Sequence, residues 1–170
     1  VMVSGYAGIG KSALVAEVHK PIVAHNGYFL EGKFDQFQRH VPYAALAQAL
    51  RGLVGQLLAE SELRLAEWKA LLLDALGANG QLAIDLAPDL VHIIGPQPPI
   101  MKLNPTEEQN RFLQAVQQLI AVFAKREHPV ALFLDDLQWC DAPTLTLLEC
   151  LVGSQDVEAL LLIGAFRDNE

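Results

Sequence analysis

A short glycine-rich segment restricts the fold more than any other feature of this sequence. It reads GYAGIGKSAL and covers residues 5–14. The apolar run VMVSG, residues 1–5, leads into it as a predicted strand, and a helical pattern follows over residues 11–24. A strand joined to a helix by a tight glycine-rich turn favours an α/β fold with a parallel sheet.

The residue types in this turn predict a site for the phosphates of a nucleotide. In the spacing GxxxxGKS, Gly5 and Gly10 allow backbone N–H groups to curl around an anion. Lys11 can reach the β and γ oxygens, and Ser12 can ligate magnesium. The helix that begins here points its positive end at the same anion. The predicted nucleotide contacts are Gly5, Tyr6, Ala7, Gly8, Ile9, Gly10, Lys11, Ser12 and Ala13.

Further along the chain, apolar runs alternate with helical patterns, as in parallel βαβ units. The predicted strands are residues 1–5, 27–34, 129–135 and 159–166. Leu, Ala and Val recur at helical spacing over residues 43–76, and the proline-rich segment 95–105 ends that pattern. Asn104, Pro105 and Glu107 then predict a helix start with a side-chain cap and a capping-box acid. The sequence therefore predicts a helical insertion between the second and third strands.

Two adjacent acids end the third predicted strand, within ALFLDDLQWCD at residues 131–141. Nucleotide hydrolysis needs an acid at a neighbouring strand tip to hold the metal's water shell, and a second group to orient the attacking water. We predict that Asp135 serves the metal and that Asp136 serves the water. A strand that ends in a solvated acidic turn would have the same sequence. The roles predicted for Asp135 and Asp136 therefore depend on the presence of the phosphate loop.

The composition narrows the classes of protein that fit. With 170 residues, 52% of them hydrophobic, the chain can bury one sizeable core. Its net charge of -8 disfavours nucleic acid as a partner. Cys140 and Cys150 are too few for a zinc site or a disulfide scaffold. Since no apolar run approaches the roughly 18 residues that span a bilayer, we expect a cytoplasmic protein without a membrane partner.

Five segments together resemble a known family, the origin-recognition-like AAA ATPase module of the STAND class of signal-transduction ATPases. The similarity is greatest to modules that lie between a serine/threonine kinase domain and GAF or histidine-kinase domains in large bacterial proteins. The segments are GYAGIGKSAL, FLEGKFDQFQRHVPY, EEQNRF, ALFLDDLQWCD and LLLIGAFRDNE. The resemblance implies ATP and Mg²⁺ as ligands, and Arg167 as a catalytic sensor of the γ-phosphate. A surface arginine paired with Asp168 is the alternative reading.

The resemblance also implies an architecture. We expect a P-loop three-layer α/β sandwich with strand order 1-4-3-2, in which residues 1–170 are an ATPase core truncated at both ends and a fifth strand beyond the first is missing. Lys33, Asp35 and Arg111 recur in the family without an evident role. The second strand should lie far from the phosphates, so a conformational or partner contact is our hypothesis for Lys33 and Asp35.

Three functions remain open at this stage. The first is an ATP-hydrolysing switch that acts on other domains of the same polypeptide, with a possible nucleotide-dependent oligomer. The second is a scaffold that binds ATP or ADP without useful turnover. The third, a DNA-loading ATPase, follows from the fold name alone and is disfavoured by the acidic charge.

Overall fold

The computed structural model describes residues 1–6, 9–38 and 40–167, and its strands form one parallel sheet. The strands are β1 (Met2–Ser4), β2 (Tyr28–Lys33), β3 (Val130–Asp135) and β4 (Leu160–Phe166). Their order across the sheet is β1-β4-β3-β2, and each neighbouring pair is parallel. The predicted α/β fold and strand order are therefore confirmed. Because the strands are parallel, their carboxyl ends share one edge of the sheet, where ligands bind in such folds.

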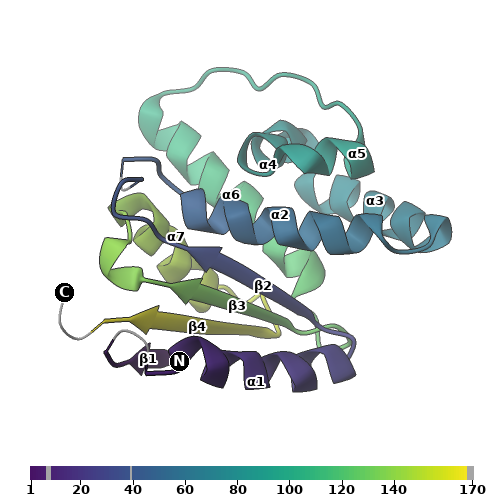
Figure 1. Ribbon diagram of the computed structural model, residues 1–170. Coiled ribbons are helices and arrows are strands. Elements are labelled where there is room, and N and C mark those ends of the chain that lie inside the picture. Colours follow the sequence, from purple (N-terminus) through teal and green to yellow (C-terminus); the bar gives the residue numbers. More distant parts are fainter. Residues whose placement is uncertain (7–8, 39, 168–170) are drawn as a thin grey trace.

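Helices cover both faces of this sheet (Figure 1). They are α1 (Lys11–Ala24), α2 (Ala44–Leu58), α3 (Glu62–Leu76), α4 (Gly80–Leu86), α5 (Val91–Ile94), α6 (Pro105–Phe123) and α7 (Ala142–Gly153). Helix α1 lies on one face, whereas α2, α6 and α7 lie on the other (Figure 1). The predicted insertion between β2 and β3 is confirmed as α2 to α6. In the described part of the chain, no helix has both the length and the apolar character needed to cross a membrane.

Side-chain caps set where several helices begin. Asn104 accepts a hydrogen bond from the amide of Glu107 at 3.0 Å, which confirms the predicted start of α6. Glu107 was the predicted capping-box acid. The carboxylate that bonds to the backbone before α6 is instead that of Glu108, whose Oε1 accepts a hydrogen bond from the amide of Leu103 at 3.2 Å. Ser61 caps α3 in the same way as Asn104 caps α6, so the predicted helical stretch 43–76 is two helices rather than one.

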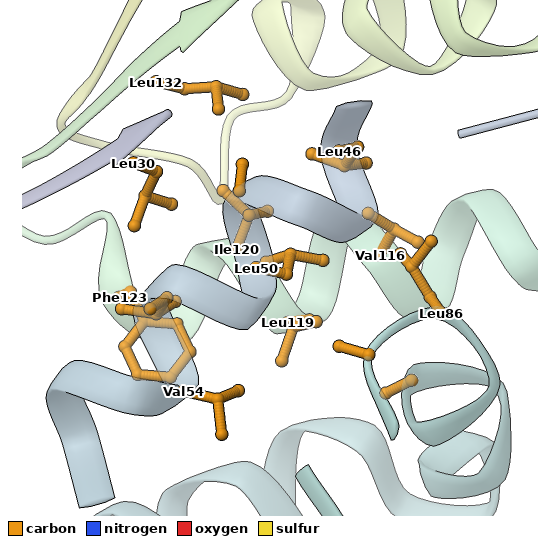
Figure 2. Packing of buried hydrophobic residues seen from close by; sticks show 14 of the residues in the cluster. Leu30, Leu46, Leu50, Val54, Leu86, Val116, Leu119, Ile120, Phe123 and Leu132 are labelled. Atoms are coloured by element: carbon orange, nitrogen blue, oxygen red, sulfur yellow. The ribbon is translucent and has the colours of Figure 1, made fainter. Parts of the chain in front are cut away.

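The main core lies between the sheet and the helices of the insertion (Figure 2). Leucines from β2 and β3 contact the buried stripes of α2 and α6 there. Its members include Leu30, Leu132, Leu46, Leu50, Val54, Val116, Leu119, Ile120 and Phe123. Each such side chain contributes roughly 1.5–3 kcal/mol on burial. A smaller cluster on the other face packs Val15 of α1 against Phe133, Ile163 and Ala165.

A close contact between β2 and α2 fixes the position of α2 beside the carboxyl edge of the sheet. Gly32 of β2 lies directly under the backbone of α2, where a Cβ atom would collide with the carbonyl oxygen of Ala45. Gln48, one turn further along α2, accepts the amide of Lys33 through Oε1 at 3.0 Å. The absence of a side chain at Gly32 thus determines how near α2 comes to the strand.

Gly32→Ala should destabilise the domain, because the backbone of α2 would have to move away from β2. We expect a loss of about 1–3 kcal/mol, the usual cost of overpacking, measured by denaturant unfolding. Gly52→Ala is the matched control, since Gly52 lies on the exposed side of α2 with nothing within 4 Å of the added Cβ. That variant should gain about 0.5–1 kcal/mol from helix propensity. Equal effects of the two changes would contradict the close contact.

Candidate active site

The predicted phosphate loop connects the end of β1 to the start of α1 at the carboxyl edge of the sheet. Gly10 has a φ of 100°, a backbone conformation that residues with a side chain rarely adopt. The first helical bond runs from Leu14 N to Gly10 O at 3.0 Å. The amides of the three residues before Leu14 therefore have no partner within the helix, and Gly10 at the N-cap position has no side chain that could cap them. Such an N-terminus suits an anion.

The predicted nucleotide contacts are described to different extents. Gly5 and Tyr6 follow β1, Ile9 and Gly10 precede α1, and Ala13 lies exposed in its first turn. Ala7 and Gly8 lie outside the described residues. Lys11 and Ser12 occupy the first two positions of α1, and only their backbone is described. The roles of these residues in nucleotide binding stay predictions.

The two acids at the end of β3 have different backbone conformations. Asp135 is the last residue of the strand, and Asp136 follows with a φ of 55°, in the left-handed region. Asp135 accepts the amide of Asp136 through Oδ1 at 2.9 Å. Asp135 is half-buried, while Asp136 is only 6% exposed. The sharp turn therefore places the two neighbouring carboxylates in different surroundings.

The buried carboxylate of Asp136 is held by two cations and an amide. Arg167 donates from Nε to Oδ1 at 3.1 Å and from Nη2 to Oδ2 at 3.5 Å. The ammonium of Lys33 lies 3.4 Å from Oδ2. Gln138 donates to Oδ1 at 3.3 Å and accepts the backbone amide of Arg167 at the same distance. These contacts compensate the cost of burying a charge that would otherwise be unpaired.

Arg167 is the first residue after β4, the strand between β1 and β3. Its guanidinium contacts Asp136, and its alternative partner Asp168 lies outside the described residues. The structure thus brings Asp135, Asp136 and Arg167 together at the edge of the sheet that also carries the phosphate loop.

Lys33 belongs to this site although sequence reasoning placed its strand far from the phosphates. The strand order confirms that β2 is at the opposite end of the sheet from β1. Lys33 is in register with Asp135, however, and its ammonium reaches the carboxylate of Asp136, the residue that follows β3. The register of β2 against β3 is the signal that could have revealed this contact.

Two other residues without a predicted role have structural partners. Arg111 donates from Nε to Oδ1 of Asn79 at 2.6 Å and from Nη2 to the carbonyl of Ala78 at 3.4 Å. It therefore ties α6 to the turn before α4. Asp35 accepts the amide of Phe37 through Oδ1 at 2.9 Å, which orders the loop between β2 and α2.

Trp139 and Cys140, which follow the acids, belong to the packing of the domain. Trp139 is half-buried against the main core, and Cys140 is also half-buried against it. Burial, with a smaller effect of the nearby Asp141 carboxylate, raises the pKa of the Cys140 thiol to about 11. The thiol is therefore protonated near neutral pH and is a poor nucleophile.

The backbone amides and carboxylate oxygens at the carboxyl edge of the sheet suit the phosphates of a nucleotide and a magnesium ion. Magnesium prefers oxygen ligands. Oδ1 of Asp135 accepts a hydrogen bond from the amide of Asp136, and Oδ2 is a second carboxylate oxygen that can serve as a ligand. The uncapped start of α1 offers amides to phosphate oxygens. Fold and site together define a nucleotide-binding domain of the P-loop class.

Comparison with known proteins identifies the family. The family model for the AAA ATPase domain matches residues 1–163, and the chain belongs to this family. It is 37% identical over 154 residues to hybrid signal transduction histidine kinase G of Dictyostelium discoideum, a match that covers 91% of the chain and 4% of that protein. It is 24% identical over 163 residues to histidine protein kinase 1 of Candida albicans, covering 87% and 7%. The chain spans less than a tenth of either relative.

Proposed function

We propose that this domain binds ATP with magnesium and hydrolyses it to switch the conformation of a larger signal-transduction protein. The observation that supports this most directly is the buried Asp136 carboxylate held by Arg167 at the edge where α1 begins. The relatives that match most of the chain are named as histidine kinases, which favours a regulatory role among other domains. The motifs in the sequence favour the origin-recognition-like STAND class within the family.

Each residue then has a chemical task. Lys11 and the first amides of α1 bind the phosphates, and Asp136 orients the attacking water and accepts its proton. Ser12 and Asp135 would hold magnesium, which neutralises negative charge on the phosphates when it is bound. Asp136 must loosen its ion pairs before it can act as a base, because a carboxylate engaged by two cations is a weak proton acceptor.

The pairing of Arg167 offers a way for nucleotide to change the site. A guanidinium that pairs with Asp136 can instead pair with a γ-phosphate, which carries more negative charge. Moving Arg167 would leave Asp136 with fewer partners and would shift the end of β4. The presence of a γ-phosphate would thus bias the site between two arrangements.

A scaffold that binds nucleotide without turnover is the second candidate. It is favoured by the same ion pairs, because Lys33 and Arg167 together hold Asp136 in an arrangement unsuited to proton transfer. A turnover measurement on the full-length protein separates the two. Release of phosphate that depends on Asp136 supports the switch, whereas ATP that stays bound and intact supports the scaffold.

Arg167→Ala should abolish the conformational response to the γ-phosphate while the domain still binds nucleotide. In the full-length protein, we expect ATP affinity within several-fold of wild type and loss of the difference between ATP and ADP in assembly or shape. Size-exclusion profiles with each nucleotide measure this. Arg126→Ala, a change at an exposed arginine before β3, is the control. If the wild-type profiles are the same with ATP and with ADP, the switch is wrong and the scaffold gains support.

A further inference from the structure

A second feature of the same edge is a cavity of about 990 Å³ between β2, α2 and the hydrolysis residues. We call it the β2–α2 cavity, and its polar lining includes Lys33, Gln36, Gln48, Arg51, Asp136 and Arg167. Any molecule that enters it meets Lys33 and Arg167, the two cations that hold Asp136. A ligand in the β2–α2 cavity can therefore change the ion pairs of Asp136.

One wall of the β2–α2 cavity is a continuous face of α2. Ala44, Ala47, Gln48 and Arg51 line it at helical spacing, while the opposite stripe of α2 is buried in the core. The bond from Lys33 N to Gln48 and the close contact at Gly32 hold this wall against β2. The wall is thus built by the fold and does not depend on a bound ligand.

The charge of the lining favours an acidic ligand. Lys33, Arg51 and Arg167 gather here, in a chain with 12 basic and 20 acidic residues. Of the two acids in the lining, Asp136 pairs with Lys33 and Arg167, and Asp35 accepts a backbone amide of its own loop. The guanidinium of Arg51 lies 4.0 Å from the carboxylate of Asp89, and both side chains are exposed. Such a pair is weak and can exchange for another carboxylate.

The loop between β2 and α2 contributes Asp35, Gln36 and Gln38 to the lining of the β2–α2 cavity. Phe37 lies between the lining residues Gln36 and Gln38, and its side chain is 75% exposed. The loop backbone is held by the bond from Phe37 N to Asp35, by one from Val41 N to Gln38 O at 2.9 Å, and by one from Tyr43 N to Thr144 Oγ1 at 3.0 Å. An exposed aromatic ring beside a cationic groove matches a polypeptide better than a small inorganic anion.

We propose that the β2–α2 cavity binds an acidic polypeptide segment, with carboxylates on Arg51 and Lys33 and an apolar residue against Phe37. Its carboxylate would compete with Asp136 for Lys33, so binding would release Asp136 from one of its two cations and raise hydrolysis. The effect on hydrolysis rests on the proposed function, whereas the binding itself does not.

Peptide selection on the full-length protein tests the binding. Random twelve-residue peptides displayed on phage are first depleted on the R51E variant and then selected on wild type, without nucleotide. We expect the selected peptides to be rich in Asp and Glu and to carry an aromatic or aliphatic residue. A selection that yields no enriched peptide, or peptides without excess acid, would overturn the proposal.

Matched variants then locate the site. Fluorescence anisotropy of a selected peptide should show at least about tenfold weaker binding to F37A, because the peptide loses its apolar contact. L63A and R126E should stay within about twofold, since Leu63 is as exposed as Phe37 and Arg126 is an exposed cation elsewhere. Equal losses in F37A and L63A would contradict the site. Peptide binding to a wild-type protein that releases no phosphate would support the cavity and count against the proposed function.

Discussion

Lys11→Ala is expected to abolish tight ATP binding while leaving the fold intact. Lys11 is the first residue of α1 and the only lysine in the predicted phosphate loop. A hydrogen bond to a charged group is worth about 1.5–3 kcal/mol. Two such bonds, to the β and γ oxygens, correspond to an affinity loss of roughly 10²- to 10⁴-fold. Isothermal titration with magnesium-ATP measures the change.

The control for this prediction is the other lysine of α1. Lys20 lies on the exposed side of the helix and pairs with Glu17 at 3.0 Å, so Lys20→Ala removes the same charge from α1 away from the loop. Its ATP affinity should stay within about twofold of wild type, as is usual for a surface change. Thermal unfolding with and without ATP gives a second measurement. If ATP protects Lys11→Ala as well as it protects wild type, the phosphate-loop assignment fails.

Most of the sheet could be predicted because its strands carry a strong local signal. The run at residues 130–135 is apolar until its last position, as expected for a strand covered on both faces. The start of α1 was also predictable, because Gly10 and the residues around it specify a turn from strand to helix. In these segments the local pattern and the tertiary fold require the same conformation.

The division of residues 43–76 into α2 and α3 combines the local N-cap at Ser61 with contacts that the helical spacing does not contain. Glu60, between α2 and α3, accepts hydrogen bonds from the hydroxyl of Tyr28 at 2.9 Å and from Nε1 of Trp68 at 3.1 Å. These bonds join β2, the turn and α3, residues far apart in sequence. Helical spacing over residues 43–76 could predict helix but not the position of this break.

The acids and Arg167 of the candidate site could be predicted from sequence, but their pairing could not. Asp135 and Asp136 were identified by their place at the end of a predicted strand, and Arg167 by the family resemblance. The ion pair from Lys33 to Asp136 requires the register of β2 against β3 and the left-handed turn at Asp136. Both are properties of the folded sheet. The ion pairs of the Asp136 carboxylate could therefore be identified only from the three-dimensional structure.

Asp136→Asn is expected to leave ATP bound and to slow its hydrolysis by roughly 10²- to 10⁴-fold, the usual effect of losing a general base. The backbone should tolerate the change, because asparagine readily adopts the left-handed conformation that Asp136 has at a φ of 55°. Arg167 and Lys33 would then face a neutral amide, which leaves more positive charge to attract a γ-phosphate. We therefore expect ATP affinity equal to or higher than that of wild type.

Comparison with Asp135→Asn decides whether the two acids have separate roles. That change should instead weaken magnesium-dependent ATP binding, because Asp135 is the predicted metal ligand. Asp156→Asn, at an exposed acid before β4, controls for the loss of one negative charge. Single-turnover phosphate release measures hydrolysis, and titration with and without magnesium measures binding. If Asp135→Asn and Asp136→Asn reduce binding and turnover equally, the two acids share one task and the assignment of separate roles to them is wrong.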